Sequence, residues 1–165
     1  MTSKERKLMN AIKADKVEVV RFILKSGVDI NTRDDLGNTA VMGVRSVEML
    51  NLCLEYGANL NMKNKNMDSV LTVWAKRLDK QKCREMHLAP LSESEFFDIW
   101  KVARRKDIDM FSKNCDMRTA KSYLDENNPN QKPLVMELHK YEKLQKVKEA
   151  DAKRSEQQEK PEGKQ

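Results

Sequence analysis

Hydrophobic residues in the N-terminal half of the chain recur in short groups with helical spacing, and polar residues or glycines separate the groups. Apolar residues within 8–12 and 19–24 form two such groups, with a polar break at 14–16. The pattern predicts two short helices within residues 5–26, joined by a tight turn. A further apolar segment of the same kind spans residues 47–54. We therefore expect a chain built from short, paired helices.

Two of these apolar segments are followed by nearly the same phrase, GVDIN at 27–31 and GANLN at 57–61. A glycine directly after a helix suits the left-handed conformation with which many helices end. The next residues alternate between apolar and polar, as an extended arm does. The phrase therefore marks the end of a helix and the start of an arm, repeated at an interval of 30 residues.

This arrangement resembles the ankyrin repeat, whose unit combines a β-turn arm with two antiparallel helices at a period near 33 residues. The first unit spans residues 5–31, and the second, which begins near RDDLGNTAVM, spans 34–61. A partial third unit containing NKNMDSVLTVWAKR spans 64–88. The resemblance implies an all-α stack of about two and a half repeats with hairpin arms in residues 1–88.

Two departures from the family pattern affect the second and third units. The interval of 30 residues is about three short of the usual period, and the shortfall lies between Val44 and Val47, so we expect a clipped first helix. In the third unit Met67 replaces the expected glycine, and residues 79–85 lack an apolar stripe. Because about three repeats are needed for a stable stack, residues 86–104 are candidates for a C-terminal cap.

Residues 89–128 show a different pattern. Ser92 and Glu95 form a capping box ahead of apolar residues spaced at i, i+3, i+4 and i+7, which predicts a helix within 91–107. Helical spacing recurs over 116–126 and predicts a second helix.

A helix, a short acidic loop and a second helix resemble an EF-hand. A calcium-binding loop needs oxygen ligands at its first positions, a glycine at position 6 and a glutamate at position 12. With Phe111 at position 8, Asp109 takes the glycine position and Cys115 takes position 12. We therefore expect a degenerate EF-hand-like helix pair or a cap, and we disfavour calcium binding. A calcium-responsive adaptor remains an alternative function.

The C-terminal segment, residues 129–165, combines an amphipathic helix with a charged tail. Apolar residues at helical spacing between Leu134 and Val147 predict a helix of about four turns. Beyond Ala150 the only apolar residue is Ala152, and we expect a disordered tail there.

Charge is unevenly distributed along the chain. The 32 Lys and Arg residues exceed the 26 Asp and Glu residues and give a net charge of +6. The excess concentrates in residues 76–106, where nine basic residues meet five acidic ones. An electrostatic binder of nucleic acid or anionic surfaces through this segment is therefore a second alternative. No array of base-stacking aromatic residues accompanies it, so we favour solvated helix faces and disfavour nucleic acid.

The sequence carries no recognisable catalytic, cofactor or metal motif. Phosphate-binding glycine loops and a GxSxG elbow are absent, and His87 and His139 lie apart from other metal-ligand residues. Cys53 lies among leucines and is predicted to be a core residue. We therefore predict that the protein is not an enzyme and has no cofactor and no metal.

Three widely spaced cysteines and no CxxC pair indicate reduced thiols in an intracellular compartment. The first residues lack the apolar run of a signal peptide, and no apolar stretch reaches membrane-spanning length. We expect a cytoplasmic protein, with the nucleus left open.

The ankyrin resemblance implies a protein–protein interaction module or adaptor that binds another protein. In that family, partners lie across the hairpin tips and the inner helices, and variable side chains there determine what is bound. Carried onto this chain, the candidate partner-binding residues are Arg33, Asp34, Asp35, Met42, Arg45, Lys63 and Lys65.

Overall fold

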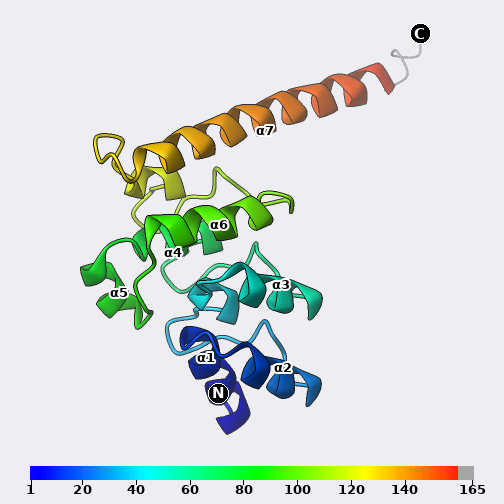
Figure 1. Cartoon of the computed structure of the whole chain (residues 1–165). Helices are drawn as coiled ribbons and strands as arrows, with labels where there is room; N and C mark the ends of the chain where they lie inside the picture. The colour runs from blue at the N-terminus through cyan, green and yellow to red at the C-terminus, as the bar shows by residue number, and fades with distance from the viewer. Residues whose placement is uncertain (160–165) are drawn as a thin grey trace.

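The computed structural model describes residues 1–159, and within that range it is all-α apart from two isolated β-bridges. Figure 1 shows helical units stacked one upon the next from the N-terminus, with one long helix lying across the far end of the stack. The predicted all-α stack is therefore confirmed, although it contains four units, described below, where two and a half were expected.

The first unit consists of α1 (Ser3–Lys13) and α2 (Val17–Lys25). Thr2 and Glu5 form a capping box at the start of α1, because each accepts a hydrogen bond from the backbone N–H of the other. The apolar groups predicted from the sequence supply the buried side chains of both helices: Leu8, Met9, Ala11, Ile12, Val20 and Leu24.

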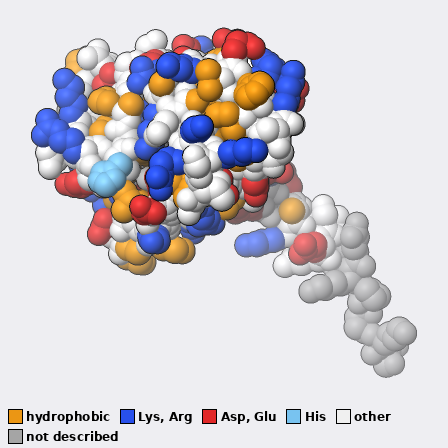
Figure 2. Space-filling view, turned by 90° about the horizontal axis from the view of Figure 1, so that it is seen from below, with side chains coloured by type: hydrophobic (Ala, Val, Ile, Leu, Met, Phe, Trp, Pro, Cys, Tyr) orange, Lys and Arg blue, Asp and Glu red, His pale blue; other side chains and the backbone are white. Residues whose placement is uncertain are grey.

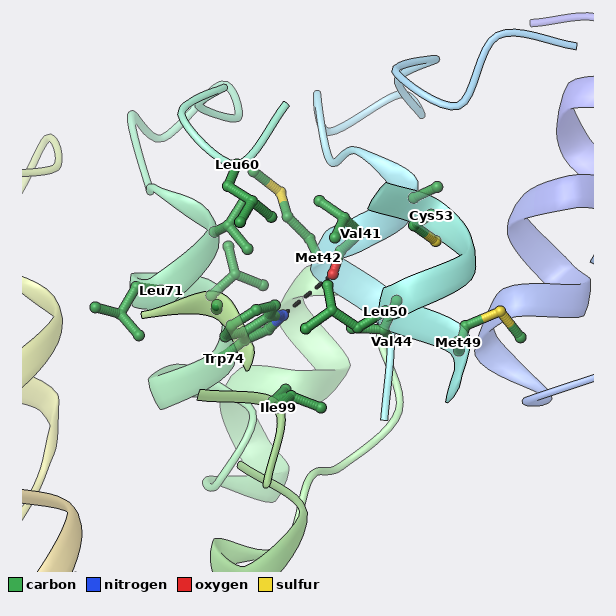
Figure 3. Packing of buried hydrophobic residues seen from close by; sticks show 14 of the residues in the cluster. Val41, Met42, Val44, Met49, Leu50, Cys53, Leu60, Leu71, Trp74 and Ile99 are labelled. Carbon is green, nitrogen blue, oxygen red and sulfur yellow. Dashed lines mark hydrogen bonds between the residues drawn. The ribbon is translucent and has the colours of Figure 1, made fainter. Parts of the chain in front are cut away.

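The second unit pairs η1 (Ala40–Gly43), a short 3-10 helix, with α3 (Val47–Glu55). The predicted clipping of its first helix is confirmed, since only four residues remain helical. The indole of Trp74, from the next unit, compensates by donating a 3.1 Å hydrogen bond to the carbonyl of Val41 (Figure 3). This bond ties the shortened turn into the core.

The third unit has an inner helix α4 (Val70–Lys76) and an outer helix α6 (Glu93–Ala103). Residues 77–92, which include the short helix α5 (Lys80–Met86), are an insertion between them. The capping box predicted at the start of α6 is confirmed. However, α6 packs against α3 as the outer helix of this repeat, and it is not the first helix of an EF-hand-like pair.

The prediction of a second helix over residues 116–126 is wrong, so residues 89–128 do not form the expected helix pair. Residues 114–118 make a tight turn, and only η2 (Ala120–Tyr123), a 3-10 helix, follows it. The side chain of Asn114 accepts hydrogen bonds from two backbone N–H groups of the turn, which favours this conformation over a continuing helix. With α7 (Lys132–Glu159), this segment forms a fourth unit.

The four units pack in chain order. The inner elements α1, η1, α4 and η2 contact one another in succession, and so do the outer helices α2, α3 and α6. One hydrophobic core runs through the stack, and Figure 3 shows the part of it that surrounds Trp74. At the C-terminal end Trp100 of α6 packs edge-on against Tyr141 of α7, with ring centroids 5.1 Å apart.

Helix α7 reaches beyond the stack (Figure 1). Leu134 and Leu138 are buried in its N-terminal half, whereas the side chains of residues 146–158 are exposed. The prediction of a disordered tail after Ala150 is wrong for residues 151–159, which continue the helix. The rest of the predicted tail, 160–165, lies outside the described residues.

Candidate functional site

Three tight turns with one shared geometry connect the stacked units; we call these turns, residues 34–38, 64–68 and 114–118, the repeat tips. In each, the first side chain accepts hydrogen bonds from the backbone N–H groups two and four residues later. The distances are 2.9 and 2.9 Å at Asp34, 3.0 and 3.0 Å at Asn64, and 3.0 and 3.1 Å at Asn114.

The fourth residue of each repeat tip has a left-handed backbone. Gly37 has φ +77°, while Met67 and Met117 have φ +61° and +59°. A non-glycine residue in this conformation costs about 1–2 kcal/mol. Both methionine side chains are nevertheless exposed, by 46% and 71%, so packing does not account for them.

Backbone hydrogen bonds join adjacent repeat tips. The N–H of Lys65 donates to the carbonyl of Leu36 at 3.0 Å, and the N–H of Cys115 donates to the carbonyl of Asn66 at 3.0 Å. The three turns therefore form one continuous surface, which we call the tip ridge.

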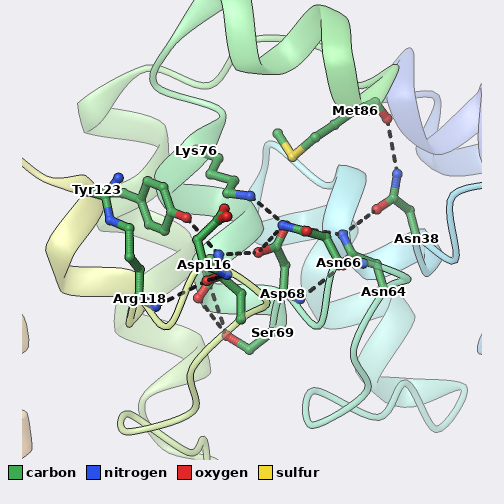
Figure 4. A network of polar contacts seen from close by, with 12 residues as sticks. Asn38, Asn64, Asn66, Asp68, Ser69, Lys76, Met86, Asp116, Arg118 and Tyr123 are labelled. Atoms are coloured by element: carbon green, nitrogen blue, oxygen red, sulfur yellow. Dashed lines mark hydrogen bonds and ion pairs between the residues drawn. The ribbon is translucent and has the colours of Figure 1, made fainter.

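A buried polar network supports the tip ridge from beneath (Figure 4). The amide of Asn64 donates to Asn38 at 3.0 Å, and the amide of Asn114 donates to Asp68 at 2.8 Å. Asp68 is 1% exposed, and its charge is paired with Lys76 at 2.8 Å. Because a buried carboxylate is stable only when it is paired and hydrogen-bonded, this network fixes the relative positions of the turns.

Insertion 77–92 lies against the inner face of the stack, and Figure 1 shows α5 on the side away from α2 and α3. Arg77 is fully buried and anchors this segment. Its guanidinium donates to the carbonyls of Met42 at 3.1 Å, Val44 at 2.5 Å and Ala89 at 2.8 Å. Desolvation lowers the pKa of Arg77 to about 10, so it stays protonated at neutral pH.

Between α5 and the tip ridge lies an open cleft of about 490 Å³. The amide of Asn38 bonds the carbonyl of Met86 at 3.1 Å and closes one end of it. Its walls carry both charge signs, from Lys65 and Lys76 and from Glu85 and Asp116. The cleft therefore lacks the single-sign field expected of a site for a strongly charged small ligand.

The residues predicted at the first repeat tip have different roles. Asp35 is exposed, whereas the Asp34 carboxylate is occupied by the turn. Arg33 is exposed, but its guanidinium donates to the carbonyl of Lys63 at 2.7 Å and so links two units.

Of the other predicted site residues, Lys65 is exposed, and Lys63 and Arg45 are half-buried. Met42 is 0% exposed, so its assignment to a partner-binding surface is wrong. Met42 lies in η1, which Trp74 and Arg77 of the third unit cover by donating hydrogen bonds to the carbonyls of Val41 and Met42.

Sequence reasoning missed the third repeat tip and with it Asp116, Met117 and Arg118, which are all exposed. A signal was present. DDLGNTA, NKNMDSV and NCDMRTA each begin with Asp or Asn and carry Ser or Thr five residues later. The absence of glycine in the second and third copies concealed the likeness.

Three of the nine basic residues in the predicted basic segment 76–106 are buried or paired with an acidic side chain distant in the chain. Lys76 and Arg77 are buried, and Arg104 pairs with Glu137 of α7. These three residues are therefore less available to bind nucleic acid than the sequence suggested.

Within residues 1–159, no group of three or more His, Cys, Asp and Glu side chains is placed to hold a metal ion. Cys53 is buried, as predicted, and desolvation raises the pKa of its thiol to about 12, which makes it a poor nucleophile. None of the described helices is both long and apolar enough to cross a bilayer.

Residues 8–42 match the family model described as ankyrin repeats (many copies). Over these residues the chain is similar to ankyrin repeats. Such repeats typically serve as protein-binding modules and are generally not catalytic. A comparison with curated protein sequences found no match.

The structure is also similar to the ankyrin repeat domain of Bcl-3, a member of the IkappaB protein family, with a TM-score of 0.58 and 20% sequence identity. The match covers 81% of this chain, so the ankyrin-type fold extends past residue 88. This chain spans about half the length of the Bcl-3 chain. At this identity the likeness concerns the fold.

Proposed function

We propose that this protein is a non-catalytic interaction module that binds another protein across the tip ridge. The observation that carries the proposal is the pair of exposed methionines, Met67 and Met117, at left-handed positions of adjacent repeat tips. Local strain that no buried contact explains commonly belongs to a functional surface. Methionine is flexible and polarisable, and suits an adaptable protein-binding surface.

Charged side chains surround these two methionines. Asp35, Lys65, Asp116 and Arg118 are exposed on the same three turns. A ridge with apolar points between charges of both signs resembles a protein interface, with an apolar centre and a polar rim, more than it resembles a nucleic-acid groove. Arg33 and Lys63 border these turns and remain predicted contacts. Arg45, in the loop between η1 and α3, also remains a predicted contact. A cytoplasmic location also remains a prediction.

The test is affinity capture from a cell lysate followed by mass spectrometry, with the wild type beside Met67→Gly/Met117→Gly. This double variant relieves backbone strain, so its thermal stability should equal or exceed that of the wild type. If the double variant no longer captures a partner, unfolding of the variant cannot then be the cause. Met136→Ala, which removes a 62% exposed methionine from α7, is the matched control.

We expect the double variant to lose a protein partner that the wild type and Met136→Ala both capture. A partner retained by all three proteins would place the interaction elsewhere on the chain. We favour this proposal over the calcium-responsive alternative, because residues 104–119 form a repeat arm and tip.

A further inference from the structure

The N-terminal end of the stack exposes apolar side chains of α2. Phe22 is 76% exposed and Val19 is 46% exposed. Figure 2 looks at this end of the molecule and shows hydrophobic groups lying among Lys and Arg side chains. Phenylalanine carries a large apolar surface, and such exposure on a folded unit commonly marks a contact site.

The residues of α3 that correspond to Val19 and Phe22 are buried. The phrases that start at Gly27 and Gly57 set an offset of 30 residues, so Val19 corresponds to Met49 and Phe22 to Leu52. Met49 is 0% and Leu52 is 2% exposed, and α3 packs against α2. Figure 3 shows Met49 pointing toward the first unit. The positions of Val19 and Phe22 in the first unit are therefore the ones that, in the second unit, pack against the unit before it.

The charge of the first unit indicates what could cover this end. Residues 3–26 carry seven basic residues and three acidic ones. The three acids are already engaged: Glu5 in the capping box, Asp15 with the hydroxyl of Ser46 at 2.8 Å, and Glu18 with Arg21 at 3.6 Å. Because the basic residues outnumber the acidic ones, the first unit carries a net positive charge that attracts acidic groups.

A second copy of the chain is a poor complement to this surface. A twofold dimer through it would place the same patch against itself. The exposed Lys4, Lys7 and Lys25 would then face like charges across the interface. Such juxtaposition disfavours association, whereas acidic residues on a partner would favour it.

We propose that the N-terminal end face, formed by Val19 and Phe22 with the surrounding Lys and Arg side chains, binds an acidic amphipathic helix of a partner protein. The helix takes the place of a preceding outer helix, lays its apolar stripe on Val19 and Phe22, and directs its Asp and Glu residues to the basic rim. This surface is at the end of the stack and is independent of the tip ridge.

The test uses the full chain and fluorescein-labelled 18-residue peptides, with binding measured by fluorescence anisotropy. One peptide carries Leu at i, i+3, i+4 and i+7 and Glu on the flanks. A second replaces every Glu by Lys, and a third keeps the Leu/Glu composition in shuffled order. Val19→Ser/Phe22→Ser is the test variant. Leu144→Ser/Val147→Ser, which alters an exposed apolar pair on α7, is the matched control.

We expect the ordered Leu/Glu peptide to bind, the test variant to weaken that binding at least tenfold, and the control variant to leave it unchanged. Raising the salt concentration or substituting Lys4, Lys7 and Lys25 by Ala should also weaken it. Circular dichroism of each variant checks that the stack is intact.

Four results would overturn the proposal. The Lys or shuffled peptide could bind as tightly as the ordered Leu/Glu peptide, or the test variant could bind it normally. Sedimentation could show a wild-type dimer that the test variant dissociates, which would identify a second copy as the occupant. Phe22-dependent binding to phosphatidylserine vesicles without peptide binding would identify a membrane surface.

Discussion

The second and fourth units have nearly the same tip but very different sequences. The tip of the second contains Gly37 and was recognisable in the sequence, whereas the tip of the fourth contains Met117 and resembled part of an EF-hand. In both tips the side chain of the first residue, Asp34 or Asn114, accepts hydrogen bonds from the backbone N–H groups two and four residues later. The Asx side chain is therefore the feature that the two turns share. Glycine reduces the backbone strain and, at Gly37, also leaves room for the backbone of Lys65.

The outer helices of these units extend the comparison. Helix α3 has nine residues and α7 has 28, and the third unit separates its helices with insertion 77–92. The stacking order of the inner elements survives these changes. Packing between neighbouring units therefore preserves the architecture where the repeat period is lost.

The largest effect is expected from removing the anchor of the insertion. Arg77→Ala leaves three carbonyl groups without their donor and opens a cavity, so the free energy of unfolding should fall by about 3–5 kcal/mol. Denaturant unfolding measures the loss, with the exposed Arg105→Ala as the control. A loss below about 1 kcal/mol would show that the insertion is not held by this residue.

The next effect tests whether the repeat tip at 114–118 is equivalent to the repeat tip at 64–68. Asn114→Ala and Asn64→Ala each remove the acceptor that closes the turn and one donor of the buried network, and each should cost about 2 kcal/mol. Thermal unfolding of both variants makes the comparison. A negligible change for Asn114→Ala alone would break the equivalence.

Substitutions at the left-handed position should have opposite signs in the two tips. Gly37→Ala places a Cβ 2.8 Å from the backbone nitrogen of Lys65 at φ +77° and should destabilise by about 1–2 kcal/mol. Met117→Gly removes strain at φ +59° and should stabilise by about 0.5–1 kcal/mol. The melting temperatures of the two variants should therefore move in opposite directions, and a shift in the same direction would contradict the strain argument.

The last effect arises only above about pH 9 and concerns the buried thiol of the second unit. Burial raises the pKa of Cys53 to about 12, above the ordinary value of 9.0, so the unfolded chain loses its proton first as the pH rises. The wild type should lose stability between pH 9 and 12, by at most about 1.4 kcal/mol per pH unit from this group. Cys53→Ala should lack this contribution. The difference in free energy of unfolding between Cys53→Ala and the wild type should therefore change between pH 9 and 12. A constant difference in denaturant unfolding would argue against the shift.

Much of the fold and part of the site could be predicted from local patterns. The apolar spacing of the first unit, the clipped first helix of the second and the capping box at Ser92 all depend on residues close together in the chain. The same holds for the exposed positions Asp35 and Lys65. Helical periodicity and capping depend on residues that are close in the chain, so they can be predicted from the sequence without a structure.

The sequence by itself determined the repeat type and the Asx residues that close the three tips. Only the tertiary structure decided which segment completes each unit, because that depends on contacts between residues distant in the chain. Met42 is buried since Arg77 and Trp74 close over its shortened turn, and Asp109 belongs to a repeat arm since Asn61 of the preceding unit bonds its N–H. A repeat cannot bury its own apolar face, so its boundaries are set by its neighbours.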